Sequence, residues 1–110
     1  MLTISGGAKL FLYGSPVDMR KGFEGLGYLI EQTFEAEITS GSYFIFLNRA
    51  KDRMKVLYWD VDGLAIWYKR LEKGTFSSKE RTNAQITRRD FLLLLEGVTP
   101  KRINRRYNVA

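Results

Sequence analysis

Three successive β-strand signals between residues 43 and 71 constrain the fold more than any other feature of the chain. The segments 43–47, 53–59 and 64–71 are rich in aromatic and β-branched residues, which favour strands. Residues 60–63 read Asp-Val-Asp-Gly, which is the chemistry of a three-residue hairpin loop with glycine in the left-handed conformation. We therefore expect a small antiparallel meander in the middle of the chain.

The predicted loop also determines which side chains share a face of the sheet. With three loop residues, Lys55 lies directly opposite Lys69, and such like charges favour a polyanion between them. Because side chains alternate along a strand, one face is the expected core and comprises Met54, Val56, Tyr58, Leu64, Ile66 and Tyr68. The other face is basic and aromatic and comprises Arg53, Lys55, Leu57, Trp59, Trp67, Lys69 and Leu71.

A short strand and a helix are predicted before the meander. Residues 9–13 read as a strand that joins the sheet. After it, Ser15 at the N-cap, Pro16 at the first helical position and Asp18 at the third form a capping box. Apolar residues then recur every three or four positions, which predicts a long helix to about Glu35, packed on one face of the sheet.

A second, shorter helix is predicted after the meander. Thr87 and Asp90 form another capping box, and the helix should end at Gly97. The predicted fold class is therefore α+β: a small antiparallel sheet with a long N-terminal helix and a short C-terminal helix. We expect one domain over residues 1–97, followed by a basic, mobile tail over residues 98–110.

The C-terminal helix carries five consecutive apolar residues, 91–95. So short a helix cannot turn all five toward one core, so part of its surface should meet another chain or the tail. Leu94 and Leu95 are the candidate partner-binding residues, and a homo-oligomer is left open.

The residue types that are missing exclude several kinds of chemistry. The chain of 110 residues has neither cysteine nor histidine, so thiol and imidazole chemistry is absent. Asp60 and Asp62 could hold a magnesium ion, or they could be turn residues only. A two-metal nuclease needs at least three converging carboxylates, and no third is apparent. We therefore expect no catalytic residues, no metal site and no cofactor.

Positive charge is concentrated in the second half of the chain. Residues 51–110 carry 14 basic and 7 acidic side chains, whereas residues 1–50 carry 4 and 5. Such asymmetry makes nucleic acid, and DNA in particular, a plausible partner. The candidate nucleic-acid-binding residues combine cations for phosphates with rings for bases and comprise Arg20, Lys21, Arg49, Lys51, Arg53, Lys55, Trp59, Trp67 and Lys69.

Each of these candidates has a plainer alternative. The two tryptophans could belong to a second packed layer, with the tips of the basic side chains reaching outward to water. Arg20 and Lys21 could hold an anion together with the helix N-terminus, or they could simply form a solvated face.

No membrane segment or targeting signal is expected. No run of residues approaches 18 apolar positions, and the first residues lack the basic start and apolar core of a signal peptide. These features predict a cytoplasmic protein without membrane contact.

Three stretches in order resemble the small accessory protein, of the TnpB-like, second-open-reading-frame type, of the IS-sixty-six group of bacterial insertion sequences. They are residues 16–26, residues 40–49, and residues 52–60 with parts of 63–74. The resemblance implies participation in transposition beside a separate, larger transposase, and it brings no catalytic residues. Residues 37–39 and 75–78 depart from the family pattern, as does the chain after Gly97.

Three functions remain open at this point. The leading one is a non-enzymatic accessory protein of an insertion sequence that binds nucleic acid through the basic and aromatic face. The alternative is an adaptor that binds the transposase without touching nucleic acid. A metal-dependent nuclease is the third.

Overall fold

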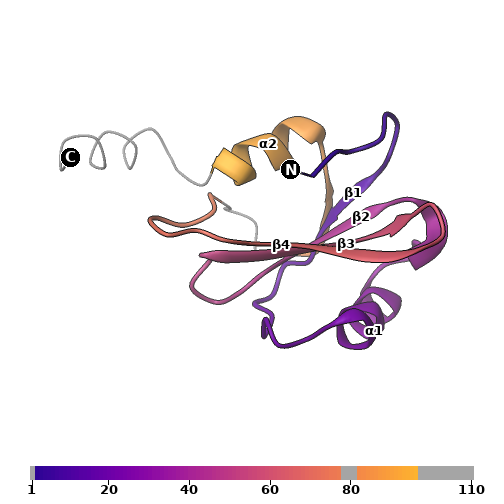
Figure 1. The fold of residues 1–110 in the computed structure, drawn as a ribbon, viewed down its shortest axis with the longest axis horizontal. Coiled ribbons are helices and arrows are strands. Elements are labelled where there is room, and N and C mark those ends of the chain that lie inside the picture. The colour runs from indigo at the N-terminus through magenta and orange to yellow at the C-terminus, as the bar shows by residue number, and fades with distance from the viewer. Residues whose placement is uncertain (1, 78–81, 97–110) are drawn as a thin grey trace.

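The structure is a computed structural model that describes residues 2–77 and 82–96. It consists of a five-stranded mixed sheet with a helix on each side (Figure 1). The strands lie in the order β4-β3-β2-β1-β5, and only the pair β1 and β2 is parallel. In chain order the elements are β1 (Leu10–Leu12), α1 (Phe23–Thr33), the 3-10 helix η1 (Ile38–Ser40), β2 (Tyr43–Leu47), β3 (Arg53–Asp60), β4 (Gly63–Arg70), β5 (Ala84–Ile86) and α2 (Arg88–Glu96).

The sheet differs from the predicted antiparallel meander, so the expected fold class is wrong. The strands predicted between residues 43 and 71 are present, but β1 joins them in parallel, pairing Leu10 with Tyr43 and Leu12 with Ile45. A parallel neighbour requires a crossover, and the chain makes it through α1. The edge strand β5, which pairs with β1, was not predicted at all. The result is a sheet-dominated fold with two short helices.

The first helix is short because tertiary contacts override the capping box predicted at Ser15. Helix α1 begins at Phe23 and has 11 residues. The backbone N–H of Val17 instead donates to the carbonyl of Leu47 at 2.9 Å, and the Val17 side chain is buried in the core. The Asp18 carboxylate accepts bonds from Arg20 rather than capping a helix. Residues 14–17 therefore continue beside β2, a turn over residues 18–21 follows, and the helix begins only after it.

The hairpin between β3 and β4 has two loop residues rather than the three predicted. Asp60 pairs with Gly63, which leaves Val61 and Asp62 as the loop, with Val61 in the left-handed region at φ 53°. A β-branched residue in that conformation costs about 1–3 kcal/mol, so the sequence did not indicate it. Changing the loop by one residue moves all the side chains of β4 to the other face.

The new register separates side chains that were predicted to lie together. Lys55 lies opposite Tyr68 rather than Lys69, and Val56 lies opposite Trp67. Since alternate residues share a face, Arg53, Lys55 and Trp59 lie on one side of the sheet, and Trp67 and Lys69 on the other. The predicted basic and aromatic face is therefore not a single surface.

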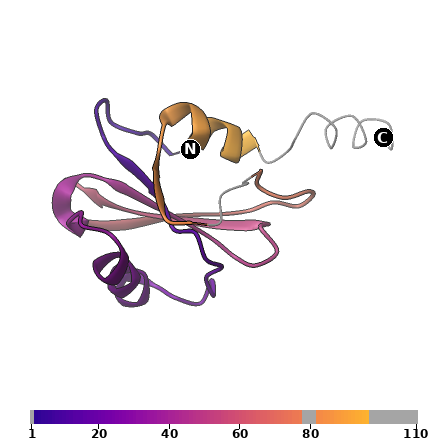
Figure 2. The same cartoon turned by 180° about the vertical axis from the view of Figure 1, so that it is seen from behind.

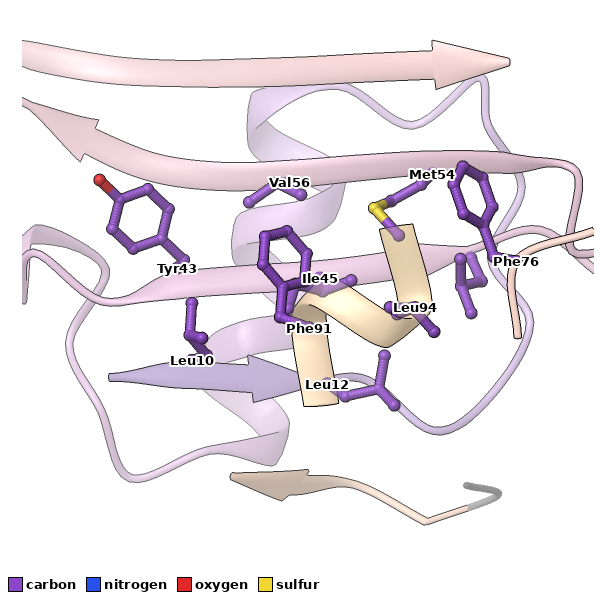
Figure 3. Close-up of a cluster of buried hydrophobic side chains, with 10 residues drawn as sticks. Leu10, Leu12, Tyr43, Ile45, Met54, Val56, Phe76, Phe91 and Leu94 are labelled. Atoms are coloured by element: carbon purple, nitrogen blue, oxygen red, sulfur yellow. The ribbon is translucent and has the colours of Figure 1, made fainter. Parts of the chain in front are cut away.

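Each face of the sheet buries its own apolar cluster. The cluster beneath α2 (Figure 3) contains Leu10, Leu12, Tyr43, Ile45, Leu47, Met54, Val56, Phe76, Phe91 and Leu94. The cluster beneath α1 contains Val17, Leu26, Ile30, Phe44, Phe46 and Leu57. Figure 2 shows the two helices on opposite sides of the sheet, so the sheet is covered on both faces.

Helix α2 begins as the sequence predicted. The Thr87 hydroxyl accepts from the Asp90 N–H, and the Asp90 carboxylate accepts from the Thr87 N–H, both at 3.0 Å. The bond from the Thr87 N–H to the carboxylate, followed by the interaction with the Thr87 hydroxyl, holds the pKa of Asp90 below its usual range. The predicted helix end at Gly97 and the predicted tail over residues 98–110 lie outside the described residues.

The leucines predicted to bind a partner are placed differently. Leu94 is buried in the cluster beneath α2, and Leu95 packs against the same cluster, so neither forms a free surface. The exposed apolar residues of this helix are Leu92 and Leu93, with 58% and 49% of their surface accessible. A helical period of 3.6 residues explains this, because Phe91, Leu94 and Leu95 share the face that meets the sheet.

Gly14 has no room for a side chain in this fold. Its N–H donates to the Asn83 side chain at 2.7 Å, and a Cβ atom would lie 2.7 Å from the Thr82 Cα and 2.8 Å from the Asn83 nitrogen. We expect Gly14→Ala to lower the free energy of unfolding by about 1–3 kcal/mol, measured by urea denaturation, because backbone must move. Gly6→Ala, where a Cβ would meet nothing, is the matched control; equal losses would contradict the packing.

Candidate functional site

An open groove of about 790 Å³ lies where the connection between β1 and α1 meets the turn between β2 and β3. Three arginines and an aromatic ring line it: Arg20, Arg49, Arg53 and Tyr68. A smaller adjoining hollow of about 330 Å³ is lined by Arg53, Tyr68 and Arg70. We call the surface formed by these five residues the arginine groove.

Asn48 builds the turn that carries two of the arginines. Its side-chain oxygen accepts bonds from the N–H groups of Asp52 and Arg53, both at 3.0 Å. Its side-chain nitrogen donates to the Asp52 carboxylate at 2.6 Å. These bonds close the turn locally, as asparagine side chains commonly do. Arg49 is consequently presented at the exposed tip, and Arg53 enters β3 beside it.

The Asp18 carboxylate balances the positive charge of Arg20, one of the arginines of the groove. The Arg20 guanidinium lies 2.7 Å from the Asp18 carboxylate, and this bond, with a second from the Arg20 N–H, lowers the pKa of Asp18 to about 2. Asp18 therefore stays ionised at any ordinary working pH, and Arg20 adds little net charge to the groove. Arg20 and Lys21 were predicted to lie in the first turn of a helix, and this placement is wrong, because both residues precede α1. Their binding of an anion stays a prediction.

The uncompensated charge of the groove comes from Arg49 and Arg53. Within the described residues, neither guanidinium forms an ion pair. Arg53 donates to the Tyr68 hydroxyl at 3.3 Å, which leaves its charge unneutralised. Arg70 lies 3.4 Å from Glu72, but both side chains are largely exposed, and such pairs are weak in water.

Lys55 supports the groove from beneath and does not line it. Only 8% of the residue is exposed, and its ammonium donates to the Lys21 carbonyl at 2.8 Å. The same ammonium lies 4.9 Å from the centre of the Tyr68 ring, a cation–π contact. Lys55 was predicted to contact nucleic acid directly, but its buried position suits a role in holding Tyr68.

The remaining predicted residues are not among those that line the groove. Trp59 stands six residues from Arg53 along β3, about 20 Å at the usual rise, and its indole donates to the Val61 carbonyl. Trp67 packs against the cluster beneath α2, which agrees with the packed-layer alternative for that residue. Lys69 is exposed on the face opposite the groove. Lys51 lies in the turn between β2 and β3, where its carbonyl accepts a hydrogen bond from the Phe76 N–H at 2.7 Å.

Sequence reasoning missed Tyr68 and Arg70. Tyr68 was assigned to the core face, and Arg70 was not considered. A two-residue loop at Val61 and Asp62 would have placed both on the same face as Arg53. The alternation of side chains along β4 could therefore have identified both residues, but only with the correct length of the hairpin loop.

No metal site is found in the part of the chain that the structure describes. No group of three or more carboxylates gathers there in a way that could hold a metal ion. Asp60 and Asp62 belong to the hairpin end, where the Asp62 N–H donates to the Asp60 carbonyl. Among the described helices, none is long and apolar enough to cross a membrane.

Comparison with known proteins assigns the chain to a protein family. The model of the IS66 Orf2-like proteins matches residues 8–105, so the chain belongs to that family of insertion-sequence accessory proteins. The chain is 30% identical over 108 residues to the uncharacterized protein y4jC of Sinorhizobium fredii, covering 96% of this chain and 92% of that one. It is 28% identical over 76 residues to y4hO of the same organism, covering 69% and 66%. No solved structure matches.

Proposed function

We propose that this accessory protein assists transposition by binding the phosphate backbone of nucleic acid in the arginine groove. The observation that carries the proposal is the concentration of Arg49, Arg53 and Arg70 in one concave surface with little compensating acid. Guanidinium groups bind phosphate through a planar pair of donors, and release of counterions favours such binding. The protein would then act beside the transposase without performing chemistry itself.

The origin of the residues lining the groove supports the same proposal. The stretches that carry the family resemblance are separated in sequence, yet all three line this surface. Residues 16–20 come from the first, Asn48 and Arg49 from the end of the second, and Arg53 and Tyr68 from the third. Distant segments that meet at one solvent-facing groove favour a binding role, because exposed residues contribute little to the core.

Replacing Arg49 and Arg53 with alanine tests the proposal. Affinity for DNA, measured by fluorescence anisotropy at several salt concentrations, should fall roughly tenfold or more at ~100 mM salt, and the dependence on log salt should become shallower by about 1 for each lost phosphate contact. Arg89→Ala, which removes an exposed arginine from α2, is the matched control and should leave both values unchanged.

Absence of binding at ~50 mM salt would contradict the proposal and favour the second candidate, an adaptor for the transposase. One observation favours that candidate: Leu92 and Leu93 form an exposed apolar pair on α2. The groove and the leucine pair lie on different elements. Replacing the arginines of the groove therefore tests nucleic-acid binding without altering the leucine pair.

A further inference from the structure

We infer that the arginine groove accepts single-stranded nucleic acid, with a base stacked on Tyr68 and the flanking phosphates held by Arg53 and Arg70. The inference rests on the proposed function and names its substrate class. It is carried by the position of an exposed aromatic ring between cations, and by the placement of charge on the rest of the described surface.

Tyr68 is held as a rigid and accessible platform. Nearly half of the residue is exposed, at 48%, although it lies within a strand. The Arg53 guanidinium donates to its hydroxyl, and the buried Lys55 ammonium occupies a position against the ring. Because Tyr68 lines both hollows of the groove, its remaining surface opens to a ligand. A ring that is already fixed loses little conformational entropy when a base stacks on it.

Two cations flank this platform closely. The smaller hollow is lined by Arg53, Tyr68 and Arg70, so a ring and two guanidinium groups meet at one place. Successive bases of a single strand stack on aromatic side chains while basic residues follow the backbone, and every base has a face suited to this. Inside an intact duplex, the faces of the bases are already stacked on one another and cannot reach Tyr68.

Neither described helix carries the basic side chains that a helix reading duplex DNA needs along its exposed face. Helix α1 contains no lysine or arginine and carries Glu24 and Glu31. In α2 the basic residues are confined to the first turn, where Arg88 donates to the backbone carbonyls of Ile4 and Ser5. A helix that enters the major groove needs side chains that reach base edges and phosphates along its exposed face. These helices lack them.

The β3–β4 hairpin is equally unsuited to entering a duplex groove. Its tip carries Asp60 and Asp62, and a ribbon inserted tip first would bring both carboxylates near phosphates. The basic end of the hairpin is the opposite one, at Arg53 and Arg70, which pair across the two strands. Charge on the hairpin therefore favours a ligand lying across its basic end, where Tyr68 is exposed.

The experiment compares a labelled single strand of twelve nucleotides with the duplex of the same sequence, each at the same series of salt concentrations. Wild-type protein should bind the single strand about tenfold more tightly or better. Tyr68→Leu should weaken single-strand binding about tenfold, since stacking is lost, without changing the salt dependence. Tyr68→Phe should retain affinity because it keeps the ring. Tyr28→Leu, at an exposed tyrosine of α1, is the matched control and should bind normally.

The outcomes distinguish the two proposals. Equal binding of duplex and single strand by the wild type, with the arginine variants weakened, would overturn the inference and leave the proposed function standing. The same holds if Tyr68→Leu, shown by circular dichroism to be folded, binds the single strand like the wild type. Failure of both nucleic acids to bind would overturn both. The wild-type ratio decides the inference even if Tyr68→Leu fails to fold.

Discussion

Phe91→Ala should lower the free energy of unfolding by about 3–5 kcal/mol. Phe91 is fully buried and projects from α2 into the apolar cluster on that face of the sheet (Figure 3). Figure 3 shows its ring facing Ile45 and Val56, with Leu94 one turn further along the helix. Removing the ring leaves a cavity that the short helix can fill only partly, so the loss includes both transfer and cavity energy.

Leu92→Ala is the matched control for this prediction. Leu92 is the next residue on the same helix, but more than half of it is exposed. Surface truncations of this kind usually change stability by about 0.5 kcal/mol or less. Urea denaturation followed by circular dichroism measures both variants. A loss for Leu92→Ala as large as that for Phe91→Ala would mean that α2 presents a different face to the sheet.

Phe44→Ala should have a similar effect from the other side of the sheet, again about 3–5 kcal/mol. Phe44 is fully buried in β2, and its ring stacks on Phe11 with centroids 5.4 Å apart. Phe34, which follows α1, lies 5.8 Å away. Loss of this ring removes contacts that tie β1, β2 and the end of α1 together, and the aromatic pairs add to the buried area.

Phe23→Ala provides the control for the cluster beneath α1. The side chain has the same chemistry and begins α1, but half of it is exposed. Phe23→Ala should lower the free energy of unfolding clearly less than Phe44→Ala does in the same denaturation experiment. If Phe44→Ala cost under ~1 kcal/mol, α1 could not be packed on the sheet as described.

The predicted strands between residues 43 and 71 and the capping box at Thr87 and Asp90 were found where the sequence placed them. Both depend on preferences that act over a few residues: aromatic and β-branched residues suit a pleated surface, and a hydroxyl and a carboxylate satisfy neighbouring N–H groups. The capping box at Ser15 and Asp18 has equally good local chemistry but forms no helix. There the burial of Val17 and its bond to β2 outweigh a local preference of about 1 kcal/mol.

The groove was predictable only in part. Arg20, Arg49 and Arg53 were selected from their charge, and the structure brings them together; their binding of nucleic acid stays a prediction. Lys55 was selected on the same ground but is buried, because side-chain parity does not show that a neighbouring loop covers the position. Tyr68 was missed because a single loop residue reverses the faces of β4.

The sequence alone determined the residues that form the central strands, the start of α2, the absence of cysteine and histidine, and the family. The tertiary structure decided the parallel pairing of β1, the late start of α1, the loop of two residues and hence the groove. The physical reason is one of scale. Local signals are worth about 1 kcal/mol each, whereas truncating a single buried phenylalanine to alanine costs about 3–5 kcal/mol. Where the two conflict, the chain adopts the register that fills both apolar clusters.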